Sequence, residues 1–365
     1  MFILDSHCDT PSEIIRGRNM SEDNSMGHVD FPKLRRGGVD GLFFALYVPA
    51  SMDADPSVAL AHAQRLLAGA QSVVSEASDA AAFATDRESA LRNQDSGKVS
   101  IFLGLENGSP LDPSGDWKKM LCEFYEAGVR YVTLCHSRHN AICDSCAPAT
   151  PQWNGLSPFG REVIAQMNSL GILVDVSHIS DASFYDVLEC STKPVVATHS
   201  CCRALADHPR NMTDDMIRAL AARGGVIQIN FYPLFLDSGF AETLKESGIM
   251  ERGEAVEDEY IADPLNPAKR SAWAAVQDEL KSLARPSYKL IADHIDHVVS
   301  LVGVDHVGLG SDFDGIAVTP EGMEDISLLP RLFDELRNRG YSESDLCKIA
   351  SGNFFRILGC PPSHY

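Results

Sequence analysis

The sequence contains no apolar run long enough to cross a bilayer, and it has no excess of basic residues. A membrane-spanning helix needs about 18 to 20 consecutive apolar residues, so none is expected. The net charge is −20, with 51 acidic against 31 basic side chains, which disfavours nucleic acid and anionic membrane surfaces as partners. The first residues also lack the basic and apolar segments of a secretory signal. We therefore expect a soluble, cytoplasmic protein.

Cysteine is too sparse, at 10 scattered residues in 365, to form the framework of a disulfide-stabilised secreted domain. Free thiols in a reducing cytoplasm fit this usage better. Cys143 and Cys146 are the one pair at the spacing of a metal or redox motif, and without a second such pair an ordinary loop is favoured over structural zinc. No glycine-rich phosphate loop follows the first apolar run, which disfavours a dinucleotide-binding doubly wound sheet.

Short apolar runs alternate with helical segments along the chain. Eight of the runs have the character of strands buried on both faces of a parallel sheet, and nearly all are followed by a predicted helix. Eight is the number of strands that closes a (β/α)8 barrel, so we predict a single barrel domain over residues 1–365. The predicted strands are residues 2–6, 39–48, 99–105, 131–135, 171–176, 194–198, 225–231 and 306–310.

Residues 232–285, after the seventh predicted strand, are rich in proline, glycine and charge. This stretch is too long for an ordinary connection between a strand and a helix. We expect an insertion in the barrel that serves either as an active-site lid or as an oligomer contact, which leaves a homodimer open.

Ionisable residues stand at the carboxyl ends of six predicted strands. Barrel enzymes carry their active sites at this end, so we expect the side chains to meet at one rim. Imidazole and carboxylate together suit a divalent transition metal, with zinc the first choice. His7 and Asp9 project together, because alternate residues of a strand point the same way. The other rim residues are Glu106, His136, His178, His199 and Asp312.

The residues around this rim form motifs in a specific order. They are Asp-Ser-His-Cys-Asp-Thr-Pro at 5–11, Glu-Asn-Gly at 106–108, Asp-Val-Ser-His at 175–178, Thr-His-Ser at 198–200, Arg-Asn at 210–211 and Gly-Ser-Asp-Phe-Asp-Gly at 310–315. The set resembles the renal, or membrane, dipeptidase family of zinc peptidases within the amidohydrolase superfamily. The resemblance covers essentially the whole chain.

This resemblance implies a centre of two zinc ions per chain. His7 and Asp9 match the ligands of one ion. His178 and His199 match the ligands of the second ion, and Glu106 matches the carboxylate that bridges the two. It also implies that Asp312 is the catalytic acid and base.

The substrate-binding positions are matched by His136 and Arg210, and the implied substrates are dipeptides, L-Xaa-L-Xaa or L-Xaa-D-Xaa. The chemistry agrees with these roles. Two zinc ions ~3.5–4 Å apart need a shared anionic bridge, and they acidify a bridging water from a pKa of ~15.7 towards ~7. Asp312 can take the proton of the attacking hydroxide and pass it to the leaving amine, while His136 stabilises the oxyanion. Arg210 offers a planar fork to a free C-terminal carboxylate.

Alternatives remain for the reaction and for two pairs of residues. One alternative is a metal-dependent hydrolase of the same fold that acts on N-acyl amino acids or other small amides and esters. Such an enzyme would keep the metal ligands but not the role of Arg210 in binding a C-terminal carboxylate. Asp314 lies close to Asp312 in sequence; we favour Asp312 as the side chain facing the metals and Asp314 as support for the loop. His294 and His297, one turn apart on a predicted helix, are interpreted as solvent-facing.

Overall fold

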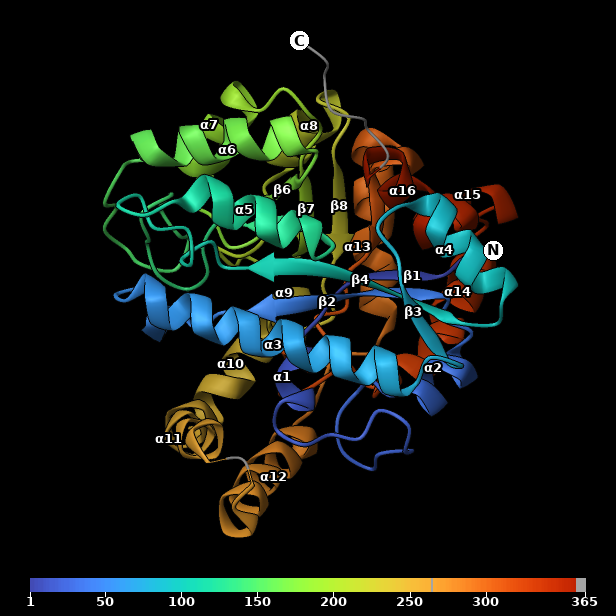
Figure 1. Cartoon of the computed structure of the whole chain (residues 1–365). Coiled ribbons are helices and arrows are strands. Elements are labelled where there is room, and N and C mark those ends of the chain that lie inside the picture. The colour runs from blue at the N-terminus through green and yellow to red at the C-terminus, as the bar shows by residue number, and fades with distance from the viewer. Residues whose placement is uncertain (264, 359–365) are drawn as a thin grey trace.

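Parallel strands form the centre of this computed structural model, which describes residues 1–263 and 265–358. Figure 1 shows the strands in the middle of the molecule, with helices packed around them. The strands of the described part are β1 (Leu4–Cys8), β2 (Gly41–Tyr47), β3 (Ala81–Phe83), β4 (Val99–Glu106), β5 (Val129–Thr133), β6 (Leu173–Asp175), β7 (Val196–Ser200), β8 (Val226–Ile229) and β9 (Val307–Leu309).

Eight of these strands follow one another around a nearly closed barrel in the order β1-β2-β4-β5-β6-β7-β8-β9, and each pair is parallel. The short strand β3 pairs with the first residues of β4. At the seam between β9 and β1, the Asp9 N–H donates to the Phe313 carbonyl at 2.8 Å and the Asp312 N–H donates to the His7 carbonyl at 3.0 Å. The predicted (β/α)8 barrel is confirmed.

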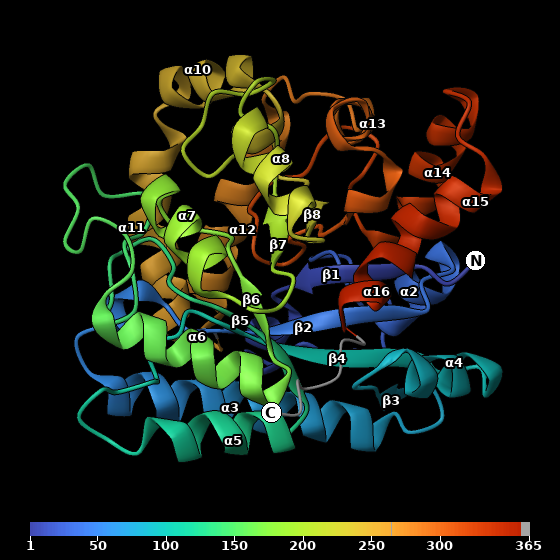
Figure 2. The same ribbon diagram turned by 90° about the horizontal axis from the view of Figure 1, so that it is seen from above.

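Helices cover the outside of the barrel, as the view from above also shows (Figure 2). Several begin at a residue whose side chain accepts a hydrogen bond from the first turn. Thr213 is one of them, and its hydroxyl accepts from the Met216 N–H at 3.2 Å. The helices up to β8 are α1 (Thr10–Ile14), α2 (Phe31–Gly37), α3 (Pro56–Glu76), α4 (Arg87–Asp95), α5 (Trp117–Glu126), α6 (Pro158–Leu170), α7 (Asp181–Cys190) and α8 (Asp214–Ala222). Those after β8 are α9 (Pro233–Leu236), α10 (Ser238–Ser247), α11 (Ile249–Ala262), α12 (Pro267–Ser282), α13 (Lys289–Val302), α14 (Leu329–Asn338), α15 (Glu343–Cys347) and α16 (Asn353–Leu358).

Aromatic side chains fill the amino-terminal half of the barrel. Phe43 of β2 stacks on Phe102 of β4 with ring centroids 4.8 Å apart, and Phe354 of α16 lies 5.0 Å from Phe43. Leu173, Val196 and other strand residues complete the same buried cluster. Because apolar residues occupy this end, polar side chains at the carboxyl ends of the strands meet over a packed core rather than over an open channel.

The segment 232–285 is mostly helical, whereas the sequence pattern suggested an irregular polar stretch. Helices α9 to α12 lie within it, and Figure 1 shows α10 to α12 standing out from one side of the barrel. Their apolar residues pack on one another in a small separate cluster that includes Phe240, Leu244, Ile249 and Leu280. Asn266 and Pro267 begin α12 as a capping residue followed by a first-turn proline, a helix signal present in the sequence.

Other differences from the predicted elements are small. The first strand begins and ends two residues later than predicted, so His7 lies within β1 rather than after it. The short helices α1, α2 and α16 and the strand β3 were not predicted. Over the described residues, no helix combines the length and the apolar character needed to cross a membrane.

Candidate metal centre

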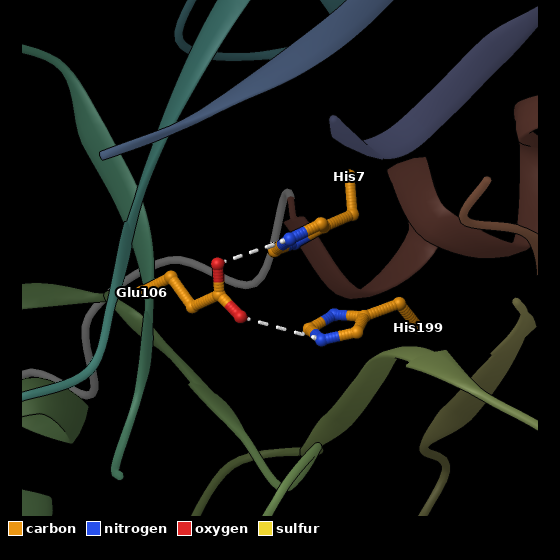
Figure 3. Close-up of side chains that lie close together, drawn as sticks. All are labelled: His7, Glu106 and His199. Carbon is orange, nitrogen blue, oxygen red and sulfur yellow. Dashed lines mark ion pairs between the residues drawn. The ribbon is translucent and has the colours of Figure 1, made fainter. Parts of the chain in front are cut away.

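Glu106, the last residue of β4, lies at the centre of the polar rim. Its two carboxylate oxygens face different histidines (Figure 3): Oε2 is 3.3 Å from His7 Nε2, and Oε1 is 3.5 Å from His199 Nε2. His178 Nε2 lies on the second side too, 3.2 Å from Oε1. Each oxygen of this carboxylate therefore has at least one histidine nitrogen close to it. This arrangement is expected of a carboxylate that bridges two cations.

The side of Glu106 that faces β1 is rich in carboxylates. His7 Nε2 is 3.6 Å from Asp9 Oδ2 and 4.0 Å from Asp312 Oδ1. Burial, followed by the charge of Glu106, raises the pKa of Asp9 to about 6. Burial and then the charge of Asp9 raise the pKa of Asp312 to about 7. Carboxylates so close together repel one another, so a cation between them would stabilise this side.

The opposite side holds imidazoles. The Nε2 atoms of His178 and His199 are 2.9 Å apart, and His136 Nε2 is 3.9 Å from Glu106 Oε1. Burial, with the positive charge of Arg210 next for His178, lowers the pKa of both His178 and His199 well below the ordinary range. Burial also lowers the pKa of His136 to about 3. The three rings are thus neutral at pH 7, the state in which a ring nitrogen can bind a metal.

The metal ligands predicted from the sequence come together, but not as the two separate sets that were expected. His7 and His199, which were assigned to different ions, share one group. The donor atoms form three groups of three within 4.8 Å: His7 with Glu106 and His199, Glu106 with His136 and His178, and His7 with Asp9 and Asp312. The geometry thus brings His136 and Asp312, which the sequence assigned to substrate binding and proton transfer, within reach of a metal position.

The donor set fits divalent transition metals. Imidazole nitrogens and carboxylate oxygens are the ligands that zinc prefers. His7 Nε2 and Asp9 Oδ1 are buried and have no hydrogen-bond partner in the described structure. Unpaired buried polar atoms are costly, and coordination would satisfy both.

The backbone at this rim is conformationally unusual. His178 has φ 72° and Asp312 has φ 63°, both in the left-handed region that non-glycine residues rarely adopt. Asn107, directly after Glu106, has φ 75°. Such conformations cost roughly 1–3 kcal/mol each and cluster at functional sites. Their position beside Glu106 makes this rim a candidate functional centre.

Asp312 and Asp314 point to different surroundings. Asp312 Oδ2 accepts a hydrogen bond from Asn230 Nδ2 at 2.9 Å, while its Oδ1 faces His7. Asp314 instead accepts from Arg18 Nη1 at 2.5 Å and from the Thr10 hydroxyl at 2.8 Å. Asp312 thus faces His7, whereas Asp314 faces Arg18 and Thr10.

Two residues beside Asp312 were missed by the sequence reasoning. Asn230, just after β8, holds Asp312 Oδ2 by the hydrogen bond above. A Cβ on Gly315 would lie 2.1 Å from Asp9 Oδ2 and 2.6 Å from Asp312 Oδ1, so only glycine allows the two carboxylates to approach. Gly315 ends the Gly-Ser-Asp-Phe-Asp-Gly motif, which was its available signal. Asn230 is a polar residue at the carboxyl end of the seventh predicted strand, the same signal that the other rim residues carry.

Arg210 lies beside the imidazole side with free donors. Its side chain is buried, with 9% of the residue exposed, and its Nη2 donates to the His199 carbonyl at 3.1 Å. The Nε and Nη1 atoms are buried without a partner. The guanidinium carbon lies 5.3 Å from the centre of the Phe235 ring of α9. A buried guanidinium with two unsatisfied donors is suited to an anionic group from outside the chain.

The whole chain is similar to known dipeptidases in sequence and in structure. A model of the membrane dipeptidase family (peptidase family M19) matches residues 1–360. The chain is 32% identical over 354 residues to dipeptidase aclJ of Aspergillus oryzae, which covers 95% of this chain and 73% of that relative. The probable dipeptidase PvdM of Pseudomonas aeruginosa superposes with a TM-score of 0.83 at 27% identity, covering 98% of this chain and 95% of that one. The chain belongs to the membrane dipeptidase family.

The family resemblance predicted from the motifs is therefore confirmed, and the chain is a metallopeptidase that acts on dipeptides. A third comparison extends the fold. A metallo peptidase from Rhodobacter sphaeroides, solved with a phosphinate mimic of the dipeptide L-Ala-D-Ala, superposes with a TM-score of 0.78 at 24% identity over 98% of each chain.

Other candidate residues of this membrane dipeptidase family member contribute no donor atom to the three groups of possible metal ligands found among the described residues. Cys143 and Cys146 are free thiols, and neither belongs to a metal-ligand group among the described residues. The expectation that His294 faces solvent is wrong. His294 is buried, its Nδ1 accepts from the Cys202 N–H at 3.0 Å and its Nε2 donates to the Leu236 carbonyl at 3.1 Å. His297 pairs with Asp214 at 2.8 Å. Neither belongs to a group of possible metal ligands among the described residues.

Proposed function

We propose that this protein is a binuclear zinc dipeptidase that hydrolyses dipeptides carrying a free C-terminal carboxylate. The observation that carries the proposal is the position of Glu106, whose two oxygens face His7 on one side and the His178–His199 pair on the other. Family membership supplies the expectation of a metal. The unpaired His7 Nε2 and Asp9 Oδ1 atoms support it independently.

His7 and Asp9 would hold one zinc ion, His178 and His199 the other, and Glu106 would bridge them. Zinc bound there supplies an acidified water and a Lewis acid for the scissile carbonyl. Two ions also account for the mixed character of the site, since an acidic side and an imidazole side are both neutralised or bonded by the cations. A single ion would leave the donor atoms of one of the two sets without a metal to bind.

Asp312 is the proposed acid and base. Its Oδ1 faces the centre while Asn230 holds Oδ2, so one oxygen stays free to carry a proton. Proton transfer by a positioned side chain is most efficient when its pKa is near the operating pH. Burial, which raises the pKa of Asp312 to about 7, supports this role.

His136 and Arg210 are the proposed substrate-binding groups. With a pKa lowered by burial to about 3, His136 is neutral and can donate one N–H to the carbonyl oxygen as negative charge develops there. Arg210 would pair its free Nε and Nη1 donors with the terminal carboxylate of the substrate. A carboxylate held at a fixed distance from the centre favours dipeptides, because one more residue moves it by about 3.5 Å.

The insertion at 232–285 is proposed to be a lid within the single barrel domain. Its first helix, α9, already contacts Arg210 and its neighbour Asn211. Phe235 lies under the Arg210 guanidinium, and the Phe235 carbonyl accepts from Asn211 Nδ2 at 2.8 Å. Movement of α9 would therefore change the surroundings of the bound carboxylate.

One experiment separates this proposal from the alternative activity on N-acyl amino acids or esters. Purified protein is analysed for metal content and assayed with L-Ala-L-Ala, L-Ala-D-Ala, their C-terminal amides, N-acetyl-L-alanine and its methyl ester. We expect two zinc ions per chain and far faster cleavage of a dipeptide than of its amide. Equal rates on acid and amide would favour the alternative, and a single ion in zinc-replete protein would contradict the binuclear centre.

A further inference from the structure

The two histidines on either side of Glu106 are each held from behind by a hydroxyl group. His7 Nδ1 is 2.9 Å from the Tyr131 phenol oxygen, and His199 Nδ1 is 2.8 Å from the Thr198 hydroxyl. In both rings the opposite nitrogen, Nε2, faces Glu106. A neutral imidazole carries one proton, so a proton on Nδ1 leaves the Nε2 lone pair free for a metal.

At His199 the buried carboxylate of Asp175 determines that the ring proton lies on Nδ1. The Thr198 hydroxyl donates its only hydrogen to Asp175 Oδ2 at 2.6 Å, so its oxygen can only accept from His199 Nδ1. Asp175 Oδ2 also accepts from the Thr133 hydroxyl at 2.5 Å. Its Oδ1 accepts from the N–H groups of Ser177 and Thr198, at 3.0 and 2.9 Å. Four donors leave Asp175 acting as an acceptor only, which fixes the direction of the chain from Asp175 through Thr198 to His199.

The Tyr131 hydroxyl reaches the His7 ring because no side chain on the neighbouring strand β4 stands in the way. Tyr131 on β5 pairs in register with Gly104 on β4. A Cβ at Gly104 would lie 2.1 Å from Tyr131 Cζ and 2.2 Å from Cε2. Only glycine at this position lets the phenol ring lie flat across β4 and reach His7. Tyr131 is fully buried, so its orientation is set by the barrel.

We propose that Tyr131 and Thr198 are positioning residues that act on the two sides separately: Tyr131 sets the orientation of His7, and Thr198, through Asp175, sets both the proton and the orientation of His199. Each would tune the affinity of one of the two metal positions. The inference rests on the binuclear centre proposed above. Hydrogen-bonded partners behind metal-binding histidines typically change metal affinity by 10- to 100-fold when removed.

The test compares three substitutions that each remove one buried hydroxyl with little change of shape: Tyr131→Phe, Thr198→Val and, as the matched control, Thr133→Val. Thr133 donates to the same Asp175 oxygen but contacts neither histidine through its hydroxyl hydrogen bond. The affinity of each zinc is measured by competition with a chromophoric chelator, and thermal unfolding of the metal-free proteins checks the fold. Tyr131→Phe and Thr198→Val should each weaken one zinc by roughly 10- to 100-fold, while Thr133→Val keeps both. Thr198→Ser, which restores the hydroxyl, should regain wild-type affinity.

The His178→Ala background identifies which ion each hydroxyl serves. There the zinc that remains should be the one at His7 and Asp9. Tyr131→Phe should weaken it, and Thr198→Val should not. Wild-type affinity for both ions in the two hydroxyl variants, or an equal loss in Thr133→Val, would overturn the inference. Failure of the wild-type protein to bind two zinc ions would overturn the binuclear proposal instead, so the two failures are distinguishable.

Discussion

The two sides of the Glu106 carboxylate differ in charge and in what they lack. The side facing Oε2 gathers carboxylates, with Asp9 and Asp312 around His7. The side facing Oε1 gathers neutral imidazoles, and behind them lies Arg210 with two free donors. One side therefore has unbalanced negative charge and the other has an unpaired cation.

This difference suits the two sides of Glu106 to different roles. Burial raises the pKa of Asp9 and Asp312 to about 6 and 7, so ionising both is costly until a cation is present. Burial lowers the pKa of His178 and His199, which keeps their lone pairs available. The free donors of Arg210 call for an anion. In the proposed arrangement both sides hold a metal ion, proton transfer belongs to the side of Asp312, and recognition of the substrate carboxylate belongs to the side of Arg210.

Removal of the shared carboxylate should have the largest effect, because it joins the two sides. Glu106→Ala takes one oxygen from each proposed metal position. We expect release or severe weakening of both zinc ions and activity near the uncatalysed level, measured by elemental analysis and dipeptide hydrolysis on the same sample. Retention of one ion at full affinity would mean that Glu106 serves one side alone.

Asp312→Asn tests the acidic side without removing a ligand of the proposed set. The substitution keeps the shape but cannot accept a proton, so turnover should fall by roughly 10²- to 10⁴-fold while both zinc ions stay bound. The measurements are kcat for a dipeptide and metal content. Loss of zinc in this variant would make Asp312 a ligand, which its grouping with His7 and Asp9 allows.

The parts of this centre that the sequence predicted are those fixed by the ends of single strands. Glu106 ends β4 and His199 lies in β7, so the barrel topology alone brings them to one rim. The partners behind them depend on pairings between distant strands. Asn230 and Asp312 are 82 residues apart, and Tyr131 reaches His7 only because Gly104 lies between them.

Two failures of prediction had signals in the sequence. His294 shares an apolar stripe with Ile291, Ile295 and Val298, at the spacing of one helix face, and that stripe is buried. The pair His294 and His297 was judged by its polarity instead. The helices of the insertion bury a core of their own, so their apolar residues are few and widely spaced. Their capping residues, rather than their periodicity, were the usable signal.

Arg210→Ala tests the cationic side and should have a smaller effect than Asp312→Asn. A hydrogen bond to a charged group contributes about 1.5–3 kcal/mol, so kcat/KM for dipeptides should fall roughly 10- to 100-fold. Dipeptide amides, which lack the carboxylate, should change little. Parallel assays of L-Ala-L-Ala and its amide in both proteins measure the difference. Similar losses on acid and amide would show that Arg210 acts through the site's structure and not through the carboxylate.

Asp314→Asn should have the smallest effect on turnover and is the matched control for Asp312→Asn. Asp314 is buried like Asp312, and burial alone would raise its pKa. The charges of Arg18 and His28, together with the hydrogen bonds from Arg18 and from the His28 backbone, outweigh burial and hold the pKa of Asp314 below the ordinary value. A lowered carboxyl pKa stabilises the folded state above the unfolded pKa, and that contribution is lost as the pH falls through the folded value. Removing one partner of a buried ion pair typically costs about 3–5 kcal/mol, so this variant should unfold at lower temperature yet keep its metals and most of its activity.

Asp312 has the opposite linkage. With a folded pKa raised to about 7, its carboxyl favours folding less and less as the pH rises from the unfolded value of 3.8 through 7. At pH 8 the metal-free Asp312→Asn protein is therefore expected to be more stable than the wild type, although it is the less active variant. The unfolding temperature of the metal-free protein at pH 8 should rise in Asp312→Asn and fall in Asp314→Asn, whereas kcat of the zinc-loaded protein should fall sharply in Asp312→Asn and little in Asp314→Asn. If Asp314→Asn lost more activity than Asp312→Asn, the two aspartates would have to exchange roles.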